Sequence, residues 1–278
     1  MSAKTSQDTP HHCVLRQGLK PLLTPCQSIG RTVLAFLSAI GSFTLFTLRA
    51  FFHIFARPFY PRLIGQQIIS IGFYSLPVVG LTALFTGMVL ALQSYTGFSR
   101  FNAESAVAAV VVLSITRELA PVLAGLMVAG RVGAAIAAEI GTMRVTEQID
   151  AMLTLSVHPF KYLIAPRLIA GTLMLPVLVL IGDVIGVFGG YLVSVYTLGF
   201  NPSLYLSQTW AILETVDVVS GLIKAGVFGC LVALMGCYCG FHSKRGAQGV
   251  GAATTNAVVL ASILILVFNY ILTQVFFS

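Results

Sequence analysis

Arg117 and Glu118 are adjacent ionisable residues inside a long apolar stretch, residues 105–129. A charge at the centre of a bilayer costs roughly 2.5–3.5 kcal/mol on insertion scales, so both side chains should face a cavity or a protein interface. Neighbours on a helix point about 100° apart, so the two are poor partners for each other. Asp183 and Lys224 bring the charges of the apolar stretches to zero, and we expect Glu118 or Asp183 to pair with Lys224 or Arg117. The simpler interpretation is a salt bridge that only fixes helix packing.

A second concentration of charge lies in residues 130–152, which hold Arg131, Glu139, Arg144, Glu147 and Asp150. A helix drawn through residues 144–153 has an apolar face of Val145, Ile149, Met152 and Leu153, with Arg144, Glu147 and Asp150 opposite. Such a helix either connects two spans at the surface or docks into a soluble partner. The small residues that precede it favour docking, because they permit close approach of other backbones.

The sequence offers no set of residues typical of an enzyme. The five histidines are dispersed, which argues against a metal cluster, and no nucleophile motif is present. The chain lacks a G-x-x-x-x-G-K-[ST] loop, so it should not bind ATP in that way. Cys230, Cys237 and Cys239 lack C-x-x-C spacing, which predicts plain packing residues. We therefore expect no catalytic residue, metal or cofactor in this chain.

The amino-acid composition indicates that the charged residues described above lie in a membrane protein. Of 278 residues 57% are hydrophobic and 9% charged, against about 25% charged in soluble domains, so the chain is an integral membrane protein. The net charge of +7 comes from scattered basic residues without stacking aromatics, which favours an anionic membrane surface over nucleic acid. Spans of about 20 apolar residues are predicted at residues 64–93, 105–129, 163–197, 218–241 and 252–277. We expect the long first and third spans to tilt or break near Pro77 and Pro176.

A sixth, weaker segment at residues 32–55 contains Arg49 and His53, and we expect it to lie in the membrane interface rather than to cross. The predicted organisation is therefore a tail at 1–30, an interfacial region at 31–62 and a membrane domain at 63–278. Lysine and arginine concentrate in the N-terminal region and in the 130–162 and 242–251 loops. Because cytoplasmic loops carry excess positive charge, we expect a cytoplasmic N-terminus and a periplasmic C-terminus. The N-terminal tail at residues 1–30 lacks the continuous apolar region and cleavage site typical of a secretory signal peptide.

The run RELAPVLAGLMVAGRVGAAIAAEIGTMRVTEQIDAM, residues 117–152, resembles the signature of the MlaE/YrbE permease family. Four further stretches agree with it: GMVLALQ (87–93), HPFKYLIAPRLIAG (158–171), LIKAGVFG (222–229) and GVGAATTNAVV (249–259). The similarity covers about residues 60–275. It implies an all-α permease that forms a homodimer in the bacterial inner membrane. The system would be an ABC transporter that moves phospholipids to periplasmic carriers and so maintains outer-membrane lipid asymmetry.

The resemblance also implies roles for residues and partners. A coupling helix at about 139–153 would contact a cytoplasmic ATPase, which binds ATP and Mg, through Glu139, Arg144, Glu147 and Asp150. Arg117, Glu118 and Lys224 would belong to the translocation region, and an outward pocket for acyl chains would include Leu90, Gln93, Phe98 and Phe101. The last two phenylalanines also fit a simple interfacial aromatic belt. Further implied partners are a STAS-domain protein and an MCE-domain protein on the periplasmic side.

Two alternatives belong to other classes. An ion-coupled secondary transporter would use Glu118, Asp183 and Lys224 as a relay and need no ATPase. A membrane scaffold that only anchors soluble subunits would tolerate a charge-neutral replacement of Arg117 and Glu118.

Overall fold

A computed structural model describes residues 20–54, 60–101 and 106–277, which form helices and connecting turns. By contacts the chain divides into two compact units, Met1–Leu48 and Arg49–Ser278. The first contains most of helix α2 (Lys20–Ile54). Its stretch Leu37–Ile54 is long and apolar enough to cross a membrane, so the interfacial placement of residues 32–55 stays a prediction.

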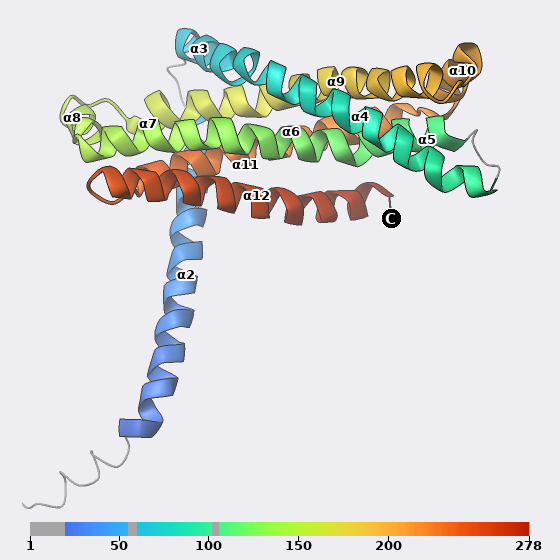
Figure 1. Cartoon of the computed structure of the whole chain (residues 1–278). Helices are drawn as coiled ribbons and strands as arrows, with labels where there is room; N and C mark the ends of the chain where they lie inside the picture. Colours follow the sequence, from blue (N-terminus) through green and yellow to red (C-terminus); the bar gives the residue numbers. More distant parts are fainter. Residues whose placement is uncertain (1–19, 55–59, 102–105, 278) are drawn as a thin grey trace, which may run out of the picture. The chain divides into compact units, whose positions relative to one another are not determined.

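The second unit contains the five spans that the hydropathy pattern predicts, each longer than expected. The apolar helical stretches are Pro61–Phe98, Ala106–Val145, Phe160–Tyr196, Thr215–Phe241 and Ala247–Phe277. Their helices are α3 (Pro61–Ile71), α4 (Leu76–Phe98), α5 (Ala106–Ser114), α6 (Ala120–Val128), α7 (Ala134–Val145), α9 (Ala165–Tyr196), α11 (Thr215–Phe241) and α12 (Ala247–Phe277). Figure 1 shows α5, α6 and α7 following one another as a single long run, in green. The described residues are thus all-α, as predicted for a membrane protein.

Short elements join or interrupt these helices. Five-residue π-helical turns separate α5 from α6 (η3, Ile115–Leu119) and α6 from α7 (η4, Ala129–Gly133), and a third, η5 (Phe160–Ile164), precedes α9. Such turns concentrate at functional sites, and η3 contains both Arg117 and Glu118.

Glycines bring α9 against two neighbours. A side chain at Gly87 of α4 would collide with the carbonyl group of Gly186 in α9, and one at Gly171 of α9 would meet the Gly229 carbonyl oxygen of α11 at 2.9 Å. Small residues allow such backbone contact between helices in a membrane. The central position of α9 between α4 and α11 therefore rests on residues without side chains.

The spans were expected to tilt or break near two prolines, and neither proline breaks its helix. Pro176 lies inside an uninterrupted α9; membrane helices tolerate proline because neighbouring groups satisfy the freed carbonyl. The first span is interrupted, but at the 3-10 turn η1 (Phe73–Ser75), ahead of Pro77. Pro77 falls in the first turn of α4, where its missing N–H has no intrahelical partner to lose.

The predicted amphipathic helix at residues 144–153 is wrong as a single element. Helix α7 ends at Val145, and a separate helix α8 spans Gln148–Thr154. Glu147 between them has a φ of 59°, the left-handed conformation that cannot continue a right-handed helix. Ile149 is buried and Leu153 is 54% exposed, so the expected apolar face is not buried as a unit.

The connection at residues 198–217 holds an unpredicted helix, α10 (Pro202–Ile212). The Asn201 side chain accepts hydrogen bonds from the backbone N–H groups of Ser203 and Leu204, which is an ordinary N-cap.

Candidate functional site

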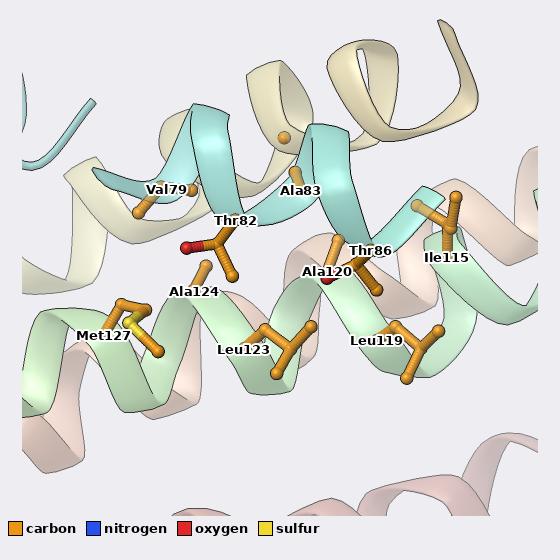
Figure 2. A pocket seen from close by; sticks show the side chains of 11 residues that line it. Val79, Thr82, Ala83, Thr86, Ile115, Leu119, Ala120, Leu123, Ala124 and Met127 are labelled. Carbon is orange, nitrogen blue, oxygen red and sulfur yellow. The ribbon is translucent and has the colours of Figure 1, made fainter. Parts of the chain in front are cut away.

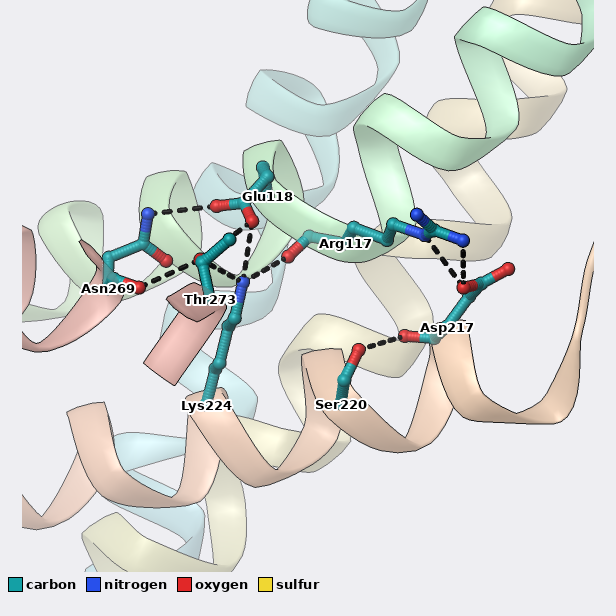
Figure 3. Close-up of polar contacts among 7 residues, drawn as sticks. All are labelled: Arg117, Glu118, Asp217, Ser220, Lys224, Asn269 and Thr273. Carbon is teal, nitrogen blue, oxygen red and sulfur yellow. Dashed lines mark hydrogen bonds and ion pairs between the residues drawn. The ribbon is translucent and has the colours of Figure 1, made fainter. Parts of the chain in front are cut away.

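Three of the four charged residues of the apolar stretches, Arg117, Glu118 and Lys224, meet where η3, α11 and α12 come together (Figure 3). We call the whole set drawn there the charged cluster: Arg117, Glu118, Asp217, Ser220, Lys224, Asn269 and Thr273. It contains two ion pairs, each of which joins η3 to α11. Two ion pairs therefore hold η3, an irregular part of the α5–α7 run, against α11.

The first ion pair joins Arg117 to Asp217. Nε and Nη2 of Arg117 lie 2.7 Å and 2.6 Å from Oδ1 of Asp217. The other carboxylate oxygen of Asp217 accepts from the backbone N–H of Glu214 at 3.1 Å, as part of a capping box at the start of α11. Arg117 also lies 4.5 Å from the ring centroid of Phe277. The Asp217 side chain is only 1% exposed and Arg117 35%, so the arginine is the accessible member.

The second ion pair joins Lys224 to Glu118. The ammonium group of Lys224 is completely buried and donates to Glu118 Oε1 at 2.7 Å, Thr273 Oγ1 at 2.8 Å and the carbonyl oxygen of Arg117 at 2.9 Å. All three of its protons are used. The second carboxylate oxygen of Glu118 accepts from Asn269 Nδ2 at 2.8 Å. Because an unpaired buried charge is costly, these partners explain how a lysine can lie inside the bundle.

The bond from Lys224 to the Arg117 carbonyl has a local cause. In an α-helix that carbonyl would accept from the backbone nitrogen four residues later, which here belongs to Pro121 and carries no hydrogen. The π-helical turn and Pro121 thus leave an acceptor that the lysine occupies.

Arg117 and Glu118 remain about one third exposed, which leaves the charged cluster open on one side. Next to it, four residues of the last turns of α12 line an open depression: Tyr270, Thr273, Gln274 and Phe277. The charged cluster thus offers one cation and one anion beside aromatic rings. This arrangement can bind a charged, amphipathic group, but it contains no nucleophile activated by a base.

The predicted pairing is confirmed through Glu118, and the alternative through Asp183 is not realised. Glu118 does pair with Lys224, and Arg117 and Glu118 do not pair with each other. Asp183 of α9 is 7% exposed, and neither carboxylate oxygen has a hydrogen-bond partner among the described residues. Arg117 instead pairs with Asp217, which sequence reasoning assigned to a loop because hydropathy alone starts the span at residue 218. The sequence signal for the true start of α11 was the capping box formed by Glu214 and Asp217, which places the first residue of the helix at Thr215.

The residues predicted to form the outward pocket lie elsewhere on the second unit. Leu90 and Phe98 of α4 are half-buried and Gln93 is exposed. The backbone of Phe101 ends the turn η2 (Ser99–Phe101), while its side chain lies outside the described residues. None of the hydrogen bonds or ion pairs described for the charged cluster involves Leu90, Gln93 or Phe98. Their assignment to a pocket stays a prediction.

The residues predicted to contact an ATPase lie at and near the α7–α8 junction, and all four form ion pairs within the chain. Glu139 pairs with the buried Arg167 at 2.7 Å, and Arg144 pairs with Asp150 at 2.8 Å. Glu147 is exposed, with Arg245 at 3.9 Å. Because Arg167 belongs to α9, this ion pair shows that Glu139 faces α9 and not solvent alone.

Fold and site together define a class: a multi-pass helical membrane protein that carries a partly buried charged cluster among its helices. Comparisons with known proteins give the family. Residues 64–275 match the family described as Permease MlaE, so the chain belongs to the MlaE permease family. A probable ABC transporter permease protein of Rickettsia felis is 60% identical over 257 residues, which cover 92% of this chain and 99% of the relative.

Two more distant relatives carry more specific names. The intermembrane phospholipid transport system permease protein MlaE of Haemophilus influenzae is 35% identical, over 90% of this chain and 97% of its own length. The chloroplastic protein TRIGALACTOSYLDIACYLGLYCEROL 1 of Arabidopsis thaliana is 38% identical, over 77% of this chain and 61% of its own length. The chain is therefore an ABC-transporter permease and a multi-pass inner-membrane protein.

Proposed function

We propose that this permease moves phospholipids between the inner membrane and periplasmic lipid carriers and so maintains the lipid asymmetry of the outer membrane. The observation that carries the proposal is the charged cluster, in which Arg117 and Glu118 stay partly exposed next to Phe277 and the depression of α12. A phospholipid headgroup offers matching charges and its chains match the apolar surroundings. The name of the Haemophilus relative supports the same substrate class.

The working unit would be a homodimer with lipid between its two copies. Leu90, Gln93, Phe98 and Phe101 would line the outward part of that space. An MCE-domain protein would receive or deliver lipid on the periplasmic side, and a STAS-domain protein would accompany the ATPase. The N-terminus would be cytoplasmic and the C-terminus periplasmic, in keeping with the basic residues of the α7–α9 connection.

ATP and Mg would bind to a separate cytoplasmic ATPase, which docks on the α7–α8 junction. The exposed side chains of this junction support the proposed docking. Leu153 and Leu155 are 54% and 75% exposed, and the acidic side chains of Glu147 and Asp150 are 74% and 54% exposed. Exposed apolar residues beside charges are typical of a protein interface.

The first test is purification of the tagged permease from its native membrane in mild detergent, with mass spectrometry of bound proteins and lipids. We expect a Walker-A ATPase and phospholipid to co-purify. The double variant Glu147→Lys/Asp150→Lys should lose the ATPase and keep the lipid. Arg100→Glu, an exposed charge reversal at the other end of the bundle, should keep both. An ATPase that is retained by the double variant would place docking elsewhere.

The second test is lipid transfer after reconstitution with the ATPase. We expect transfer to require ATP and to fall in a Lys224→Met variant. Transfer that ignores ATP and follows a proton or sodium gradient would contradict the proposal and favour the ion-coupled alternative. Unchanged cellular lipid distribution in an Arg117→Gln/Glu118→Gln variant would favour the scaffold alternative.

A further inference from the structure

A second apolar surface lies away from the charged cluster, between α4 and the η3–α6 segment (Figure 2). We call it the lateral groove. Its walls include Val79, Thr82 and Thr86 from one side and Leu119, Leu123 and Met127 from the other. Figure 2 shows Val79 and Met127 at one end and Thr86 with Leu119 toward the other. The eight residues from Val79 to Thr86 span seven helical steps, or about 10 Å, so the lateral groove matches part of one acyl chain in length.

A cation lies just beyond the Val79–Met127 end. Ser75 precedes Val79 by four residues and Arg131 follows Met127 by four, so each is about one helical turn further along. The two meet directly: Arg131 Nη1 donates to Ser75 Oγ at 2.7 Å and to the Ser70 carbonyl oxygen at 3.2 Å. The guanidinium carbon also lies 5.8 Å from the ring centroid of Tyr74. These contacts fix the arginine at the end of the lateral groove.

Arg131 differs from the other cations packed among these helices. Arg117, Arg167 and Lys224 each have a carboxylate within 2.7 Å. Among the described residues no carboxylate lies within ion-pair distance of Arg131, whose contacts use one of its terminal nitrogens. A half-buried guanidinium with remaining donors favours a bidentate anion such as a phosphate.

The depth of Arg131 is that of a lipid headgroup. Gly133, two residues on, packs against Val232 of α11, which is 17 residues or about 26 Å from the first residue of that helix. The hydrocarbon core of a bilayer is about 30 Å thick. If α11 begins near one boundary of the core, Arg131 lies close to the other.

We propose that the lateral groove is a second lipid site, in which a glycerophospholipid of the cytoplasmic leaflet places one acyl chain along the groove and its phosphate on Arg131. The proposal rests on the membrane orientation and substrate class of the proposed function. It adds a site whose lining includes no residue of the charged cluster. Met127 is 39% exposed, so the lateral groove is accessible from the surrounding lipid.

The test is photolabelling of the full-length permease in nanodiscs with a phosphatidylglycerol that carries a diazirine in one acyl chain. Labelled peptides are mapped by mass spectrometry and normalised to labelling at Phe85 and Val89, two exposed residues of α4 that ordinary surrounding lipid should reach. We expect enrichment at Val79, Thr82 and Thr86 and at residues 119–127. Arg131→Gln should lower that enrichment about tenfold, as expected for loss of one charge-assisted phosphate contact. Arg131→Lys should restore most of it.

Matched controls separate the site from general effects. Arg62→Gln removes an exposed arginine from the first turn of α3 and should leave labelling unchanged. Thr82→Trp should block the lateral groove while Arg131 stays in place, which covers the case that Arg131→Gln fails to fold. A diacylglycerol with the same photoreactive chain lacks the phosphate, and its labelling should be weak and insensitive to Arg131→Gln.

Equal labelling by the diacylglycerol, or labelling that survives both Arg131→Gln and Thr82→Trp, would overturn the proposal and leave only surrounding lipid at this surface. The measurement needs no ATPase. A negative result here with ATP-dependent transfer intact would therefore refute the lateral groove alone, and the reverse result would refute the proposed function alone.

Discussion

At the scale of single residues, Lys224 is the least replaceable side chain of the charged cluster. Its ammonium group is buried and contacts three acceptors from two other elements. Removing one member of a buried ion pair is destabilising chiefly because the other charge loses its partner. The energetic role of Lys224 is therefore tied to Glu118.

Lys224→Met should lower the stability of the detergent-solubilised protein by about 3 kcal/mol or less, since buried pairs cost 3–5 kcal/mol when broken and Glu118 is 37% exposed. The double variant Lys224→Met/Glu118→Gln should recover part of that loss, because it leaves no unpaired charge. Thermal unfolding of the four proteins of this cycle measures the coupling. Strictly additive losses would show that the two charges do not interact.

Asp183 should behave in the opposite way. Its carboxylate is buried without a hydrogen-bond partner among the described residues, and an unpaired charge is costly in an apolar interior. The neutral isostere Asp183→Asn should therefore keep expression and thermal stability within about 1 kcal/mol, a range typical of conservative changes. Asp183→Lys should abolish assembly. A severe loss in Asp183→Asn would indicate a partner for the carboxylate, such as a bound cation.

At the scale of elements, three departures from regular helix carry charged residues that concern function. They are the π-helical turns η3 and η4, with Arg117, Glu118 and Arg131, and the break at Glu147. Hydropathy predicted the five spans, because long apolar runs leave few alternatives in a membrane. It missed the irregular turns, since π-helical turns depend on tertiary partners such as Lys224 and are not encoded by apolar periodicity.

Glu147 tests the break directly. Glycine adopts a φ of 59° without the steric cost that other residues incur, so Glu147→Gly should raise stability by up to about 1 kcal/mol even though it removes a charge. Glu147→Val should lower stability, because β-branched residues are poorly tolerated in that conformation. Differential scanning fluorimetry of both variants decides between these signs. Equal effects would mean that the chain at Glu147 relaxes without cost.

At the scale of the whole molecule, glycines let helices of the second unit approach one another backbone to backbone. Gly87, Gly171, Gly186 and Gly229 lie where α9 meets α4 and α11. Sequence reasoning placed glycines in the spans but had no means to match them across helices. For the same reason it found three members of the charged cluster and not Asn269, Thr273 or Asp217, whose roles require knowledge of which helices are neighbours.

Gly87→Leu should prevent the close approach of α4 and α9, because even its first carbon would collide with the Gly186 carbonyl. We expect loss of the monodisperse peak in size-exclusion chromatography and a drop in the melting temperature of about 10 °C or more, as for other severe packing defects. Gly97→Ala in the same helix meets no atom within 4 Å and should be unchanged. A tolerated Gly87→Leu would contradict the described packing.

The run from Ala106 to Val145 contains 40 residues, or about 60 Å of helix at 1.5 Å per residue. Even at a tilt of about 40° it would extend roughly 46 Å along the membrane normal, which equals a whole bilayer with both headgroup layers. The run therefore reaches from one face of the membrane to the other. Its α7 end, with α8 directly after it, lies at an aqueous boundary, where a soluble protein can reach both.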